Sequence, residues 1–160
     1  MSNVIQVGMA DLKVVRAPDK LTTAGLGSCI GICLLDRTAK IGGMAHIMLP
    51  SSQQARSNQN RAKFADTAIE DLIAEMEKLG ASKKRLTAKI AGGAQMFNIG
   101  SSDIMKIGER NAKAVIEVLN RLNIRILAQD TGGNYGRTIV FDSVSGELLI
   151  RTIGLGERVI

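Results

Sequence analysis

The chain has 160 residues, 45% hydrophobic and 22% charged, as expected for one globular domain with its own apolar core. The formal net charge of +6 would suit an acidic partner or simply a soluble surface. Aromatic residues make up only 2%, which argues against nucleic acid as that partner. No window approaches the ~20 apolar residues of a membrane span, and the N-terminus lacks a signal-peptide pattern. We therefore expect no membrane insertion and a cytoplasmic location.

The first half of the chain predicts strands and loops. Short β-like runs occur at residues 4–7 and 14–15, and the glycines of residues 21–28 predict an irregular loop. Two apolar runs follow at residues 29–35 and 40–49, and the short segment between them predicts a β-hairpin. Both faces of these two runs are apolar, so we expect the hairpin to lie inside the protein.

Helical periodicity dominates the second half. Residues 51–60 are the most polar stretch and predict a loop, either a flap beside a site or a plain connection. Apolar side chains at offsets of three and four predict amphipathic helices at residues 61–79 and 107–122. Further strands are predicted at residues 85–91, 124–128, 138–141 and 148–152. This pattern indicates an α+β fold, a layered sandwich of mainly antiparallel β-sheet with two helices, and residues 1–160 as a single domain.

Cys29 and His46 are the candidate catalytic pair. An imidazolium beside a thiol lowers the pKa of the thiol and can later protonate a leaving amine. If residues 35 and 40 face each other across the hairpin, Cys29 lies opposite His46, with Cβ atoms ~4.5–5.5 Å apart. A slip of one residue would send the two side chains to opposite faces. We expect Cys29 to react well below the ~8.5 pKa of a free thiol.

Cys33, the other cysteine, is predicted to be a core residue. It lies four residues from Cys29 on the same face of a strand, which is ~13 Å at ~3.3 Å per residue. That separation is too large for a disulfide and argues against a zinc site that uses both cysteines. No phosphate-loop or cofactor motif is complete, so we expect no metal and no cofactor.

Glycines precede Cys29 and also follow two later apolar runs. Those before Cys29 favour a tight approach that leaves backbone N–H groups free for the oxyanion of an acyl transfer. Gly92-Gly93 and Gly132-Gly133 each follow an apolar run. They are either plain strand-end turns or loops that line the same cleft.

Six motifs in order resemble the CheD family of chemoreceptor glutamine deamidases. The first two are Thr23-Ala-Gly-Leu-Gly-Ser-Cys29 and Gly42-Gly-Met-Ala-His46-Ile-Met-Leu-Pro50. The others are Phe64-Ala-Asp-Thr-Ala68, Lys89-Ile-Ala-Gly-Gly-Ala94 with Met96-Phe97, Ile107-Gly-Glu-Arg-Asn111 and Asp130-Thr-Gly-Gly133. Each motif is modest alone, but together they cover nearly the whole chain and are specific.

The resemblance implies a Cys-His-Thr triad, with Cys29 as nucleophile, His46 as base and acid, and Thr23 orienting His46. It implies that glutamine side chains of methyl-accepting chemoreceptors are converted to glutamate through a thioester, in support of chemotactic adaptation. It also implies binding to CheC, a phosphatase of phosphorylated CheY. Two alternatives remain open: a non-catalytic module that binds CheC and receptors, and a hydrolase or transamidase that acts on another amide.

Overall fold

Residues 2–54, 60–96 and 106–160 are described by a computed structural model, in which they form ten strands and two α-helices. The strands are β1 (Val4–Gln6), β2 (Asp11–Arg16), β3 (Lys20–Leu26), β4 (Ile30–Asp36), β5 (Ile41–Ile47), β6 (Thr87–Gly92), β7 (Arg125–Thr131), β8 (Arg137–Asp142), β9 (Leu148–Thr152) and β10 (Gly156–Val159). The helices are α1 (Ala65–Lys78) and α2 (Ile107–Arg121). None of the helices in these ranges is long and apolar enough to cross a membrane.

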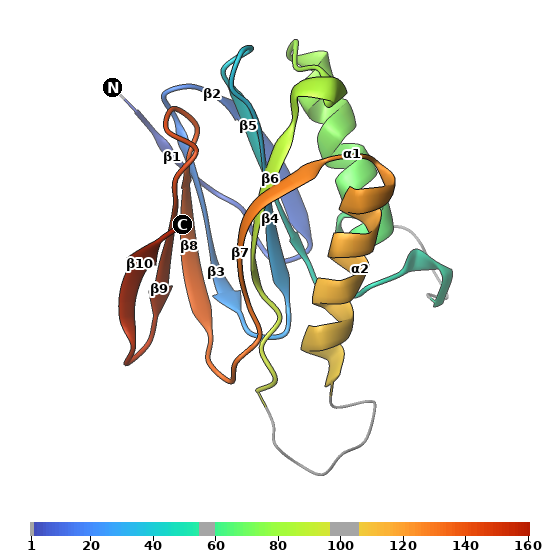
Figure 1. Cartoon of the computed structure of the whole chain (residues 1–160), viewed down its shortest axis with the longest axis vertical. Helices are drawn as coiled ribbons and strands as arrows, with labels where there is room; N and C mark the ends of the chain where they lie inside the picture. Colours follow the sequence, from blue (N-terminus) through green and yellow to red (C-terminus); the bar gives the residue numbers. More distant parts are fainter. Residues whose placement is uncertain (1, 55–59, 97–105) are drawn as a thin grey trace.

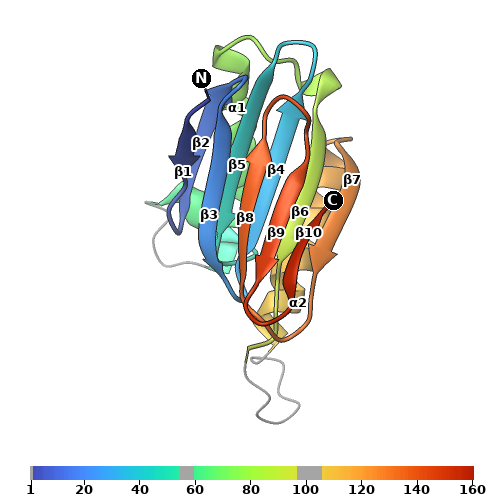
Figure 2. The same cartoon turned by 90° about the vertical axis from the view of Figure 1, so that its left-hand side faces the viewer.

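The strands form two five-stranded sheets that face each other, and both helices cover the outer face of one of them (Figure 1). The first sheet has the order β1-β3-β8-β9-β10 and the second the order β2-β5-β4-β6-β7. Figure 2 shows the first sheet in front of the second. Two strand pairs, β1–β3 and β6–β7, are parallel, and the other pairs are antiparallel. The predicted α+β sandwich of mainly antiparallel sheet is confirmed.

The β4–β5 hairpin is the middle layer of the molecule. Every residue of both strands is buried. Ile30, Ile32 and Leu34 pack with the helices, whereas Cys33 and Leu35 pack against the first sheet. This alternation follows the two-residue period of a strand and explains why both faces of the hairpin are apolar.

The prediction of an irregular loop at residues 21–28 is wrong, because most of it belongs to β3. Leu21, Thr23 and Leu26 are buried. The pairing with β8 shifts between Thr23 and Leu26, and Gly25 has a φ of +72°. A β-bulge therefore places the glycine in a left-handed conformation without ending the strand. The sequence also did not predict β10, whose residues are all exposed and show no alternation.

The predicted register of the hairpin is wrong by two residues. Asp36 pairs with Ile41, and Gly31 pairs with His46. The turn lies one residue later than predicted, since Lys40 has a φ of +59° and belongs to the turn. A shift of two residues keeps every side chain on its face of the sheet, so Cys29 is still on the same face as His46.

A buried ion pair joins the two sheets at the end where the chain crosses between them. Arg137 of β8 pairs with Leu26, the last residue of β3. Its fully buried guanidinium lies 3.0 Å from the carboxylate of Asp130 on β7 and donates to the carbonyl of Gly92. Arg158 of β10 binds the same carboxylate at 3.2 Å. These contacts hold the two sheets together at this end. Removing one partner of such a pair would leave a buried charge uncompensated.

Asp36 determines where the hairpin turns. Its buried carboxylate accepts hydrogen bonds from the N–H groups of Ala39 at 3.0 Å and Ser82 at 2.8 Å, and from Arg85 at 3.0 Å. Burial alone would raise the pKa of this carboxyl group. The hydrogen bonds and the Arg85 charge outweigh burial and lower the pKa to about 2.

Protonation of Asp36 is therefore expected to destabilise the fold in acid. Its folded pKa lies below the ~3.9 of a free carboxyl, so its contribution is complete above about pH 4 and is lost as the pH falls towards 2. We expect this contribution to the free energy of unfolding to be about 2 kcal/mol, measured by urea unfolding between pH 2 and 6. An Asp36→Asn variant that keeps the native pH dependence would contradict the assignment.

Candidate active site

The single histidine binds a threonine of the opposite sheet. His46 of β5 is buried, and its Nδ1 lies 2.7 Å from Oγ1 of Thr23 on β3. Thr23 is also buried, and the same Oγ1 lies 2.7 Å from the carbonyl oxygen of Val7. The face-to-face packing of the two sheets thus brings together two of the three residues predicted for the site.

These two contacts determine the tautomer of His46. A hydroxyl group has one proton and a carbonyl oxygen can only accept, so Thr23 donates to Val7. The threonine oxygen must then accept a hydrogen bond from Nδ1–H. In a neutral imidazole this leaves Nε2 with a free lone pair. Nε2 is buried and has no hydrogen-bond partner among the described residues, so it is available as a base.

Cys29 lies next to His46 without a hydrogen bond to it. It directly precedes β4, and Gly31, two residues later, pairs with His46. Cys29 is therefore a diagonal neighbour of His46 on the same face, a position from which side chains can still approach each other. Gly31 makes room on this face for the side chain of Ile139, which a Cβ there would meet at 2.5 Å.

Burial sets the protonation state of both groups. It raises the pKa of the Cys29 thiol and lowers the pKa of the His46 imidazole, since surroundings of low polarity disfavour the charged form of each. Near pH 7 the pair is therefore a thiol beside a neutral imidazole. The expectation of a lowered Cys29 pKa is wrong for this geometry, because it assumed an opposed pair in which the imidazolium touches the thiolate.

Cys33 is confirmed as a core residue. Its side chain is fully buried, and it pairs with Met44 on one side and Lys89 on the other. Burial raises the pKa of the Cys33 thiol, an effect that the charge of Lys89 partly offsets. Both cysteines are free.

Gly92, the last residue of β6, and Gly93 after it lie against the backbone of Cys29. The N–H of Gly93 donates to the carbonyl of Cys29 at 2.9 Å. Gly92 has a φ of +118°, and a Cβ on it would lie 2.2 Å from the same carbonyl oxygen. Gly132 of the second glycine pair donates to Gly92 at 3.0 Å. No side chain fits at position 92 without moving the backbone of Cys29.

Asn111 contacts the backbone on both sides of the site, a role that the sequence did not reveal. Its side chain is fully buried on α2. Nδ2 donates to the carbonyl oxygens of Ser28 and Met48, each at 2.9 Å. Ser28 precedes Cys29, and Met48 follows His46 by two residues. The motif at the start of α2 contained this asparagine, but no local pattern indicated which backbone atoms it would meet.

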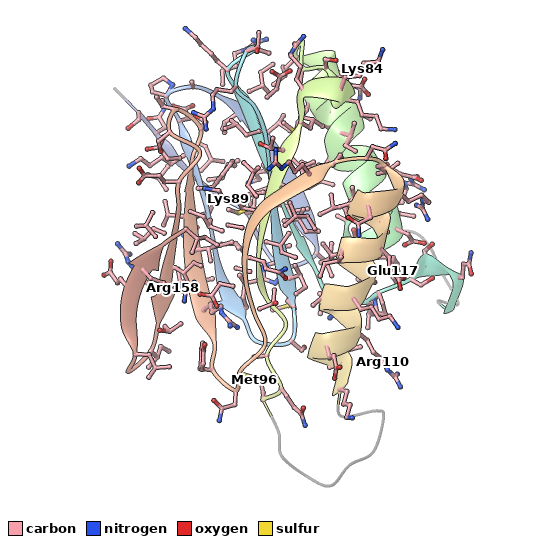
Figure 3. All side chains as sticks on the ribbon, in the orientation of Figure 1. Lys84, Lys89, Met96, Arg110, Glu117 and Arg158 are labelled. Carbon is pink, nitrogen blue, oxygen red and sulfur yellow. The ribbon has the colours of Figure 1, made fainter. Side chains whose placement is uncertain are left out.

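Two predicted features lie partly outside the described residues: the polar loop at residues 51–60, either a flap or a plain connection, and the pair Met96-Phe97. Ser52, within the described part of this loop, donates through its hydroxyl to Asp66 of α1 at 2.8 Å. The half-exposed Met96 lies over Gly27, with its Cγ 3.2 Å from the place of a Cβ there. Figure 3 shows Met96 beyond the lower end of β6.

Comparison with solved structures supports the fold class. A Neisseria meningitidis protein of the DUF152 family matches with a TM-score of 0.53 at 10% identity. The match covers 82% of this chain and 64% of that protein. At this level of identity the likeness concerns the fold alone.

Sequence comparison then gives the family. Residues 48–152 match the family described as CheD chemotactic sensory transduction. A protein of Syntrophomonas wolfei named "Probable chemoreceptor glutamine deamidase CheD" is 65% identical, with 100% of each chain covered. A protein of Desulfitobacterium hafniense with the same name is 59% identical over the same share of each chain. This chain belongs to the CheD family. The family match begins after His46, so only the full-length relatives span residues 23–46.

The single histidine makes its tautomer directly measurable. By ¹⁵N NMR we expect the neutral Nδ1–H form at pH 7 and a titration midpoint below the ~6.5 of a free imidazole, because burial disfavours the cation. Thr23→Val should remove the acceptor of Nδ1–H and mix the tautomers, whereas Thr23→Ser should preserve the native form. A native spectrum dominated by Nε2–H would contradict the assignment.

Alkylation should distinguish the two cysteines. We expect the reaction of Cys29 with iodoacetamide to follow a pKa above that of a free thiol, because burial disfavours the thiolate, and Cys33 to stay unmodified in the folded protein. No Lys or Arg separates the two residues, so tandem mass spectrometry must assign the modified one. A midpoint below pH 8 at Cys29 would instead show a direct thiolate–imidazolium pair.

Proposed function

We propose that this protein converts glutamine side chains of methyl-accepting chemoreceptors to glutamate, with Cys29 as the nucleophile, His46 as base and acid, and Thr23 orienting His46. The observation that supports this most directly is the hydrogen bond between Thr23 and His46. It leaves the lone pair of Nε2 free on the face of the sheet that carries Cys29. The names of the full-length relatives support the choice of substrate.

The proposed reaction has two stages. As Sγ of Cys29 attacks the carboxamide carbon, Nε2 of His46 takes the thiol proton. The resulting imidazolium protonates the nitrogen of the substrate, the C–N bond breaks, and ammonia leaves from a thioester. Water then attacks the thioester while Nε2 takes its proton and later returns it to the sulfur. The product is glutamate, and the enzyme regains its thiol.

Thr23 stabilises the charged form of the base during both stages. When His46 becomes an imidazolium, its Nδ1–H continues to donate to Oγ1 of Thr23, and this hydroxyl continues to donate to the carbonyl of Val7. Each of the two hydrogen bonds polarises the other. The carbonyl dipole of Val7 therefore stabilises the new positive charge through the hydroxyl group of Thr23. In a buried site this matters because little water is present to solvate the cation.

Further parts of the proposal concern the whole protein. Residues 1–160 are proposed to be one domain, since one apolar cluster contains both Ile30 and Val115. The receptor glutamines are proposed to be modified in the cytoplasm, in support of chemotactic adaptation. CheC is proposed as a partner on the basis of the family resemblance. A purified CheC that does not bind the native protein in a pull-down experiment would remove this partner.

The test of catalysis is ammonia release from a purified cytoplasmic fragment of a receptor. Cys29→Ala should lose activity by about 10⁴-fold or more, because the covalent route is closed. Cys33→Ala is the matched control and should keep activity, since the Cys33 side chain is fully buried in the core. Full activity in Cys29→Ala would refute the mechanism. A native protein that binds receptors or CheC without releasing ammonia would favour the alternative of a regulatory module.

A further inference from the structure

We propose that Asn111 is a positioning residue that aims the backbone N–H of Cys29 at the reacting carbonyl oxygen, so that this N–H donates to the oxyanion. The inference rests on the proposed function, in which Cys29 attacks an amide carbon. It names one oxyanion donor and the side chain that orients it.

The first step concerns a single peptide plane. The carbonyl of Ser28 and the N–H of Cys29 belong to the same peptide unit. This unit is trans, since the cis bond of the described residues is at Ala17–Pro18. In a trans peptide the C=O and N–H bonds point in opposite directions. Asn111 binds the Ser28 carbonyl at 2.9 Å, so this one hydrogen bond sets the direction of the Cys29 N–H.

The second step is where that N–H points. Helix α2 packs on the outer face of the second sheet, whereas the side chain of Cys29 lies in the cluster on the inner face. Because the Ser28 carbonyl is turned towards α2, the N–H of Cys29 is turned away from α2. It therefore points to the side that carries the thiol and His46. This N–H donates to no acceptor among the described residues.

The neighbouring carbonyl groups are held in the same way. Gly27 accepts from the N–H of Ala94 at 2.8 Å, and Cys29 accepts from the N–H of Gly93 at 2.9 Å. The carbonyl oxygens of residues 27, 28 and 29 thus all accept hydrogen bonds. These bonds keep the negative ends of the three carbonyl dipoles away from the developing oxyanion. Two of these bonds are between backbone atoms. The bond to Ser28 comes from a side chain, so a substitution can remove it alone.

An amide is the group that this position requires. Each of the two hydrogens on Nδ2 of Asn111 meets one carbonyl oxygen, that of Ser28 or that of Met48. An aspartate of the same size would place an acceptor against both carbonyls and could donate to neither. The repulsion would release the peptide plane, and the N–H of Cys29 would lose its fixed direction.

Two reactions of Cys29 separate the oxyanion donor from the nucleophile. Acylation by p-nitrophenyl acetate passes through a tetrahedral oxyanion, whereas alkylation by iodoacetamide displaces iodide at a saturated carbon and forms none. Loss of one oxyanion donor typically slows catalysis by ~10²–10³-fold. We expect the ratio of acylation rate to alkylation rate to fall at least about 10-fold in Asn111→Asp and Asn111→Ala, with little change in alkylation itself.

Val115→Ala is the matched control for a purely structural effect. Val115 is fully buried one turn further along α2, so the variant loses helix packing but no contact with a carbonyl group. Its ratio should equal the native ratio. The proposal fails if Asn111→Asp and Asn111→Ala also keep the native ratio. It fails too if the native ratio is no higher than that of N-acetylcysteine, a comparison that does not depend on any variant folding.

The receptor assay keeps this inference separate from the proposed function. In Asn111→Asp we expect kcat for ammonia release to fall by about 10²-fold with KM nearly unchanged. If kcat falls no further in Asn111→Asp than in Val115→Ala, the proposed role of Asn111 is contradicted and the proposed function is unaffected. Suppose instead that the native protein releases no ammonia, but its ratio of acylation to alkylation depends on Asn111. This result would contradict the proposed function and still support the N–H of Cys29 as an oxyanion donor.

Discussion

The hydrogen bond between Thr23 and His46 is the interaction on which the rest of the site depends. It crosses the interior between two sheets whose packing distance is ~10 Å, so it exists only when the sandwich is assembled. Because Thr23 must donate to Val7, the bond also determines which nitrogen of His46 carries the proton. The fold thus controls the tautomer of His46 as well as its position.

A buried neutral pair has a consequence for catalysis. Burial keeps the Cys29 thiol and the His46 imidazole uncharged at rest, so charge develops only when a substrate is attacked. In surroundings of low polarity each developing charge needs a fixed dipole nearby. In our proposal the Thr23–Val7 relay serves the imidazolium, and the N–H of Cys29 serves the oxyanion. Resting thiols are also oxidised less readily than thiolates.

The glycine-rich motifs owe their composition to close packing of backbones. A Cβ at Gly92 would meet the carbonyl of Cys29 at 2.2 Å, and a Cβ at Gly108 would meet the carbonyl of Ala94 at 2.3 Å. The first contact brings β6 against the backbone of Cys29, and the second brings the start of α2 against the segment after β6. These two close backbone contacts bring α2 near enough for the side chain of Asn111 to bind the carbonyl of Ser28. The outer helix is therefore connected to the backbone next to Cys29 through one side-chain hydrogen bond.

The sequence by itself determined the elements whose pattern is local. The helical periodicity of residues 61–79 and 107–122 predicted α1 and α2, and the apolar hairpin predicted the middle layer. It also placed Cys29 and His46 on one face, because a register error of two residues preserves the face. The family followed from motif order, which needs no geometry.

Only the tertiary structure decided what depends on partners distant in the chain. β3 remains a strand through Gly25 because the opposite sheet buries Thr23 and Leu26. The contact between Thr23 and His46 spans 23 residues, and that between Asn111 and Ser28 spans 83. Local periodicity specifies which face a side chain takes, but the atoms it meets there, and the pKa that follows, are set by packing.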